Sequence, residues 1–111
     1  MDTIIVLSTA DTLELAETIA TALVDAREAA CVNIVPEIRS IYRWEGKVCN
    51  ESECLLVIKS SAEKFAAIQV RIRSLHSYQV PEIIAVPISE GDPEYLKWLQ
   101  ASVGKARSSV H

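Results

Sequence analysis

The chain has 111 residues, half of them hydrophobic but only six aromatic, so we expect one domain with an aliphatic core. Eleven Lys and Arg residues stand against 15 Asp and Glu residues, and this acidic balance disfavours nucleic-acid binding. No apolar run approaches the roughly 20 residues that cross a bilayer, and the N-terminus lacks the cationic region of a signal peptide. With an odd number of cysteines as well, the expectation is a cytoplasmic protein with reduced thiols and no membrane contact.

The first third of the chain predicts a strand followed by a helix. Residues 3–7 are a continuous aliphatic and β-branched run, which is typical of a strand covered on both faces. Asp11 is expected to cap a helix, with Glu14 in the capping-box position. Apolar residues then recur on one side to about Glu28, which predicts an amphipathic helix.

Residues 31–59 predict one long hairpin. Two extended runs flank the turn signal Glu45-Gly46-Lys47. Pro36 cannot donate a ladder hydrogen bond, so the first strand should be bulged there or lie at an edge. The hairpin is longer than a domain of this size needs for its own core.

The remaining third predicts helix, strand and helix. Ser60 and Glu63 form a second expected capping box, and apolar residues at helical spacing follow to residue 75. Residues 81–88 are expected to form a short strand with a proline near each end. Asp92 and Pro93 mark the start of a last helix that fades by residue 104, and residues 105–111 are expected to be a frayed tail.

The order of these elements is β-α-β-β-α-β plus a terminal helix, which defines an α+β, ferredoxin-like domain over residues 1–104. Two helices cover one face of a four-stranded antiparallel sheet. The other face and the overlong hairpin need a cover that one short helix does not supply, and we therefore expect self-association.

Four blocks of the chain closely resemble the CutA, or divalent-cation tolerance, family. They are AACVNIVP at 29–36, SIYRWEGK at 40–47, LHSYQVPEII at 75–84 and GDPEYLKWL at 91–99. The resemblance covers roughly residues 3–102. It implies a tight homotrimer in which the hairpins extend sheets across subunits, and a link with tolerance to copper and other divalent ions. It also implies a likeness to the trimeric P-II signalling proteins, which bind effectors between subunits.

Metal binding is the first functional hypothesis. The resemblance implies a copper site made of a Cys after the first strand and two adjacent His residues. Ser8, Leu75 and His76 occupy these positions here, so one of the three ligands is retained. His76 is the best single ligand candidate for Cu(II) or another divalent cation, because imidazole is a common metal ligand. The alternative is that His76 caps the second helix.

The thiols give a weaker metal hypothesis. Cys49 and Cys54 are an odd number of strand positions apart, so they should point to opposite faces of a regular strand. Cys31 lies in an apolar segment, where a small buried hydrophobe is the expected role.

A polar cleft between subunits is the second functional hypothesis. Tyr42 and Trp44 share one face of the hairpin near its tip, and an aromatic face beside Lys and Glu side chains suits an anionic or aromatic small molecule. The alternative is that these aromatics bury against a neighbouring subunit. The full set of cleft candidates is Tyr42, Trp44, Glu45, Lys47, Lys59 and Glu82.

No nucleophile–base motif or metal-hydrolase motif is present, and three glycines are too few for a phosphate cradle. We therefore expect a non-enzymatic homotrimer that responds to divalent cations. The alternative is a P-II-like signalling or scaffold protein that binds an effector or a partner protein at inter-subunit clefts.

Overall fold

The structure, a computed structural model, describes residues 2–104. Its elements are β1 (Thr3–Ala10), α1 (Leu13–Asp25), β2 (Cys31–Trp44), β3 (Lys47–Ser61), the short 3₁₀ helix η1 (Ala62–Lys64), α2 (Phe65–Leu75), β4 (Ile84–Pro87) and α3 (Pro93–Ser102). This order confirms the ferredoxin-like prediction. The tail expected at 105–111 lies outside the described residues. No helix within residues 2–104 has the length and apolar character needed to span a membrane.

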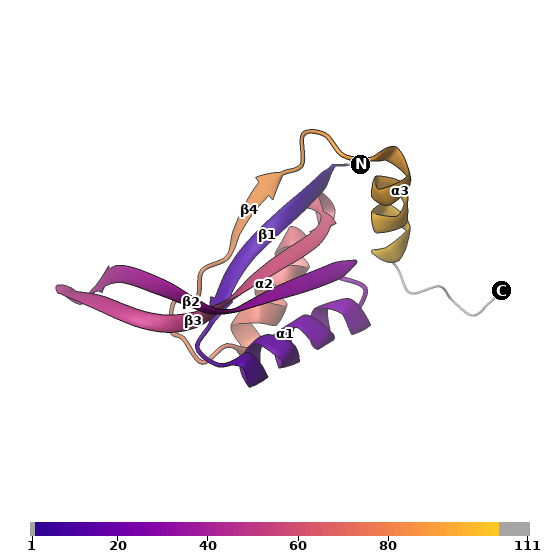
Figure 1. Cartoon of the computed structure of the whole chain (residues 1–111). Coiled ribbons are helices and arrows are strands. Elements are labelled where there is room, and N and C mark those ends of the chain that lie inside the picture. Colours follow the sequence, from indigo (N-terminus) through magenta and orange to yellow (C-terminus); the bar gives the residue numbers. More distant parts are fainter. Residues whose placement is uncertain (1, 105–111) are drawn as a thin grey trace.

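The four strands form one antiparallel sheet in the order β2-β3-β1-β4, and α1 and α2 pack on the same face of it (Figure 1). Alternate residues of β1 and β3 point into the core beneath these helices, where they are fully buried. Each large aliphatic side chain buried there contributes about 1.5–3 kcal/mol. The largest members of this core are Val6, Ile19, Leu23, Leu56, Ile58, Ile68 and Ile72.

Both ends of α1 differ from the sequence prediction. The capping residue is Thr12 rather than Asp11, because the Thr12 hydroxyl accepts a hydrogen bond from the Leu15 N–H at 3.0 Å. The helix ends at Asp25, three residues before the expected end. Arg27 takes a left-handed φ of 60° there, which ends the helix and turns the following N–H groups back onto the Leu23 carbonyl.

The expected capping box at Ser60 is wrong. β3 continues through Ser61, so Ser60 lies within the sheet opposite Ile4 and is fully buried. Its hydroxyl donates a 2.6 Å hydrogen bond to the Glu28 carbonyl instead of capping a helix. η1 makes the turn into α2, whose first turn has no side-chain cap.

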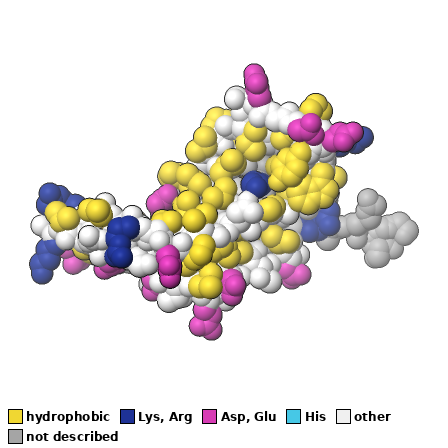
Figure 2. Space-filling view, viewed as in Figure 1, with side chains coloured by type: hydrophobic (Ala, Val, Ile, Leu, Met, Phe, Trp, Pro, Cys, Tyr) yellow, Lys and Arg dark blue, Asp and Glu magenta, His cyan; other side chains and the backbone are white. Residues whose placement is uncertain are grey.

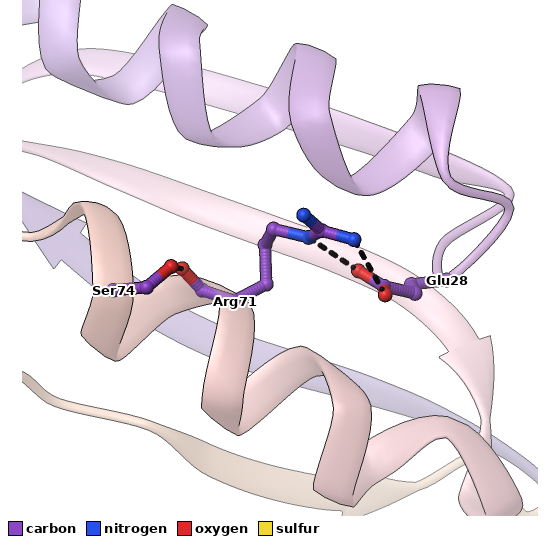
Figure 3. A network of polar contacts seen from close by, with 3 residues as sticks. All are labelled: Glu28, Arg71 and Ser74. Carbon is purple, nitrogen blue, oxygen red and sulfur yellow. Dashed lines mark hydrogen bonds and ion pairs between the residues drawn. The ribbon is translucent and has the colours of Figure 1, made fainter.

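An ion pair with two hydrogen bonds joins the loop after α1 to α2 (Figure 3). Arg71 of α2 donates through Nε and Nη2 to the two carboxylate oxygens of Glu28, at 3.0 and 2.9 Å. Ser74 donates to the Arg71 carbonyl one turn later. The pair therefore fixes the loop after α1 against the second helix.

The C-terminal part contains the predicted strand and helix, but the strand is shorter than predicted. β4 has four residues, half of the expected 81–88 segment, and pairs with β1 only from Ile84 to Pro87. Asp92 caps α3 as predicted, accepting from the Tyr95 N–H at 3.1 Å, with Pro93 in the first turn.

The hairpin of β2 and β3 is confirmed, and its outer part projects from the body of the domain as an arm (Figure 1). β1 ends opposite Cys54, so residues 38–53 pair only with one another within the described chain. We call this segment the arm. Its turn has two residues, Glu45 and Gly46, both with positive φ, as a tight hairpin turn requires. The arm makes the domain elongated, with extents of 53 × 30 × 21 Å.

The sheet face opposite the helices carries exposed apolar side chains. Val35, Ile84 and Val86 are 43%, 51% and 46% exposed there. Figure 2 shows hydrophobic side chains gathered over the region of β1 and β4 and again on the arm. Much of this second face therefore lacks a cover within residues 2–104.

Candidate functional site

A cavity of about 660 Å³ lies at the base of the arm, next to the segment that follows α2. Its lining combines aromatic, hydroxyl, amide and carboxylate groups. The lining residues are Thr9, Ser40, Ile41, Tyr42, Trp44, Glu53, Ser77, Tyr78, Gln79, Val80 and Glu82. They come from the end of β1, both strands of the arm and residues 77–82.

A β-bulge in β2 marks the point where the arm leaves the body of the sheet. Val35 is opposite Leu55 and Ile38 is opposite Glu53, so Pro36 and Glu37 together occupy the space of one residue. Glu37 takes a left-handed φ of 60° within the bulge. The extra residue reverses the alternation of β2, so that even-numbered arm positions lie on the same face as Val35 in the body of the sheet. Within the arm, pairing is regular from Trp44–Lys47 to Ile38–Glu53, and Tyr42 and Trp44 therefore share a face with Glu53.

Glu53 and Tyr78 form the innermost polar contact of the cavity. The Tyr78 hydroxyl donates to Oε2 of Glu53 at 2.5 Å, and Glu53 is only 7% exposed. Burial, followed by the hydrogen bond and the negative charge of Glu53, raises the pKa of Tyr78 well above its usual range. Tyr78 therefore remains a protonated donor at physiological pH.

Tyr42 makes a similar contact on the arm. Its hydroxyl donates to Oε1 of Glu51 at 2.9 Å. This hydrogen bond, with smaller contributions from desolvation and the Glu51 charge, raises the pKa of Tyr42 to about 12. Both tyrosines are thus held by carboxylates of β3.

His76 positions the segment that carries Tyr78. Nδ1 accepts a hydrogen bond from the Tyr78 N–H at 3.0 Å, which assigns the ring hydrogen of the neutral imidazole to Nε2. Nε2 then donates to the Thr9 carbonyl at 2.6 Å. The imidazole also contacts the Tyr78 ring, with centroids 4.6 Å apart. His76 therefore connects the end of β1 to the cavity wall.

The three positions implied as copper ligands do not converge into a metal site. Ser8 points into the core, where it is fully buried and its hydroxyl has no hydrogen-bond partner among the described residues. Leu75 packs partly buried against the core, and both ring nitrogens of His76 are hydrogen-bonded. Across residues 2–104, no three His, Cys, Asp or Glu side chains cluster as a metal site requires. The residues present at these positions therefore do not fit a copper ion.

The cysteines are free thiols. Cys49 lies half-buried on the arm opposite Tyr42, whereas Cys54 is buried in the body opposite Ala10. β3 has no register shift between them, so they point to opposite faces. Cys31 is half-buried at the start of β2.

Three of the six expected cleft residues line the cavity: Tyr42, Trp44 and Glu82. Glu45 lies in the turn and Lys47 at the tip of the arm, outside the lining. Lys59 pairs with Ile5 six residues beyond Glu53, roughly 20 Å along the strand. Whether the three lining residues bind a ligand stays a prediction.

Sequence reasoning missed Glu53 and Tyr78 as site residues. Glu53 directly precedes the apolar run of β3, and a carboxylate beside such a run is a usable signal. Glu53 shares a face with Trp44 through the regular pairing that begins at the turn of Glu45 and Gly46, so the turn signal could also have placed it there. Tyr78 lies in the 75–84 block but reaches Glu53 only because His76 holds its segment.

The fold and the cavity define a ferredoxin-like α+β protein with a cavity at the base of a projecting hairpin. Residues 4–102 match the family of CutA1 divalent ion tolerance proteins, and the chain belongs to this family.

Solved and curated relatives agree with this assignment. The divalent-cation tolerance protein CutA of Thermus thermophilus is 51% identical over 100 residues, which are 90% of this chain and 97% of that protein. Its solved structure has a TM-score of 0.90 at 50% identity and covers 92% of this chain and 99% of that one. CutA1 from Oryza sativa has a TM-score of 0.92 at 40% identity, covering 96% and 97%.

Some relatives are longer. Human protein CutA is 40% identical over 97 residues, which are 87% of this chain but 54% of that protein. The chain thus spans nearly all of the Thermus protein and about half of the human one.

Proposed function

We propose that this chain acts in tolerance to divalent cations as a homotrimer that binds ligands rather than converting them. The observation that carries the proposal is the arm: residues 38–53 form a two-stranded ribbon that pairs with no other strand of the described chain. An isolated two-stranded hairpin is marginally stable in water, so such a ribbon needs further contacts.

Side chains on the arm support a copy of the same chain as its partner. Ile41, Val48 and Trp44 are 67%, 65% and 44% exposed. The uncovered sheet face offers apolar groups that complement them, including Ile84 and Val86. Aromatic residues in such positions are enriched in the cores of protein interfaces.

The arrangement of the sheet edges favours a ring. Within residues 2–104, β2 and β4 are the two edge strands, and they present different surfaces. Contacts between two different surfaces are head-to-tail, and they generate a closed ring when the rotation closes. Three subunits is the number that the family resemblance implies.

Cation binding in this proposal uses donors from more than one subunit, because a single described chain holds no three-donor cluster. Calorimetry with Cu(II) on the native assembly and on His76→Ala tests it. Stoichiometric binding supports a cation site, and its retention in His76→Ala would show that the donors are other residues. Only weak, non-stoichiometric binding in the native protein would contradict cation binding.

The non-catalytic part of the proposal is supported by the engagement of His76. Both of its ring nitrogens already contact backbone groups, which leaves no free lone pair for general-base work. We also propose a cytoplasmic location, supported by the three free thiols. Cell fractionation that recovers the protein outside the cytoplasm would contradict it.

A second candidate function is effector binding of the P-II kind, and the cavity at the base of the arm favours it. Its volume and mixed lining fall in the range of small-molecule sites. The arm contributes one wall, so subunit assembly and ligand binding would be linked.

A further inference from the structure

The strongest feature not yet explained is the charge of the cavity. Among the described residues that line it there are two carboxylates, Glu53 and Glu82, and no Lys, Arg or His. The nearby basic residues of the arm are outside this lining. Arg43 is an odd-numbered residue of β2 and points to the face away from Glu53. Lys47 is on the same face as Glu53, but it lies opposite Trp44 at the tip, six strand positions from Glu53.

Glu53 is the more informative of the two carboxylates. Glu53 is only 7% exposed, yet it takes part in no ion pair among the described residues. Within residues 2–104, its one hydrogen bond comes from the neutral hydroxyl of Tyr78 at Oε2. A buried carboxylate without a positive partner is costly unless a cation compensates it. The cavity therefore presents an uncompensated negative charge.

The aromatic walls indicate what kind of cation would fit. Tyr42, Trp44 and Tyr78 all line the cavity. Aromatic faces attract ammonium groups through the ring quadrupole, most strongly for Trp, and they also pack against an apolar body. A bare metal ion would use neither property and would lack a third carboxylate, imidazole or thiolate donor.

From this combination we infer that the cavity at the base of the arm binds a small organic cation, a primary or substituted ammonium with an apolar body. The ammonium group lies toward Glu53, with Glu82 as a second negative group at the exposed side. The apolar body lies against Tyr78 and Tyr42, whose hydroxyls reach Glu53 and Glu51, while Trp44 lies farther out along the arm. This inference rests on the effector-binding form of the proposed function and gives its ligand class.

The inference differs in charge from the expectation drawn from the sequence, which is an anionic or aromatic small molecule beside Lys and Glu side chains, with Lys47 and Lys59 among the candidates. Neither lysine lines the cavity. The change of sign rests on Glu53, which the regular pairing of the arm places on the same face as Trp44.

Three probes of matched size test the charge preference on the native assembly: phenethylammonium, 2-phenylethanol and 3-phenylpropionate. Calorimetry near neutral pH and at low salt should show the cation binding roughly ten-fold or more tightly than the neutral probe, with the anion weakest. Binding of 3-phenylpropionate as tight as that of phenethylammonium would overturn the inference. This comparison needs no variant.

Variants then locate the site. Glu53→Gln keeps an oxygen for Tyr78 but removes the charge, and it should weaken phenethylammonium binding by roughly ten-fold or more. Glu63→Gln makes the same change in net charge on exposed η1 and should leave the affinity unchanged. Equal affinities of Glu53→Gln and Glu63→Gln would overturn the assignment, as would displacement of the probe by stoichiometric Cu(II).

Light scattering on the same samples separates the two proposals. A trimer that binds no phenethylammonium contradicts this inference and leaves the assembly intact. A monomer that binds phenethylammonium through Glu53 contradicts the homotrimer and leaves the ligand class standing.

Discussion

The hydroxyl of Tyr78 donates its hydrogen bond to the buried carboxylate of Glu53, and this contact joins the segment after α2 to the base of the arm. Tyr78→Phe removes the only described donor to Glu53 and leaves its charge buried without a partner. We expect the free energy of unfolding to fall by about 1–3 kcal/mol, measured by urea denaturation. Tyr95→Phe, on exposed α3, is the matched control and should change little. Equal stability of Tyr78→Phe and the wild type would show that the contact is unimportant.

Replacing either of two buried serines on the helix-facing side of the sheet by Ala should change the free energy of unfolding, in opposite directions for the two positions. Ser8 has no partner for its hydroxyl among the described residues, so Ser8→Ala should raise the free energy of unfolding by about 1 kcal/mol. Ser60 donates to the Glu28 carbonyl, so Ser60→Ala should lower it by about 1 kcal/mol. Chemical denaturation of both variants checks the pair, and a loss of stability in Ser8→Ala would contradict the assigned environment.

The Glu28–Arg71 ion pair should stabilise the fold by an amount that depends on salt. Arg71→Met should lower the melting temperature, while Arg71→Lys keeps the charge but not the two parallel hydrogen bonds and should recover only part of the loss. Because the Arg71 side chain is 39% exposed, about 1 M salt should reduce the difference. Arg73→Met, exposed on the same helix, is the control. Identical melting of Arg71→Met and Arg73→Met would contradict the role of the pair.

Tyr42 should titrate at about pH 12, above the ordinary value of 10.0 for tyrosine. The neutral phenol is favoured in the folded state, so its stabilising effect is complete below pH 10 and is lost as the pH rises toward about 12. Ultraviolet titration of phenolate absorbance, with Tyr42→Phe to assign the signal, measures the value. In Glu51→Ala, which removes both the hydrogen bond and the charge, the pKa of Tyr42 should fall toward 10.0. An unchanged pKa in that variant would assign the shift to another cause.

Local sequence signals identified the elements that depend on neighbouring residues. Asp92 and Pro93 mark the start of α3 because a cap needs only the next three residues. Gly46 gives the hairpin turn for the same reason, and Pro36 marks the bulge. The family blocks in the middle of the chain extended this local reading to the whole fold.

Sequence-based predictions were wrong or incomplete where the local sequence allowed two structures and tertiary contacts selected one of them. Asp11 and Thr12 are both good caps, and the observed start of α1 uses Thr12. Ser60 has the sequence of a cap but continues the ladder with β1 because β3 extends to Ser61. Glu53 joins the cavity through the segment after α2, whose Tyr78 donates to it from 25 residues farther along the chain.

The two tryptophans of the chain provide a test of the interface. Trp44 lies on the arm and Trp98 on α3, with similar exposures of 44% and 47%. Trp44→Ala should dissociate the assembly at concentrations where the wild type and Trp98→Ala remain associated, because buried aromatics are typical hot spots. Light scattering over a dilution series measures this, and an undisturbed assembly in Trp44→Ala would remove Trp44 from the interface.

The central claim is that the arm and the uncovered sheet face bind other copies of the same chain. Sedimentation equilibrium of the full chain over a wide range of dilution tests it most directly. The account predicts one species with three times the 12.2 kDa mass of the chain. A folded species that keeps the mass of a single chain at every concentration would contradict it, because the arm would then be stable without a partner.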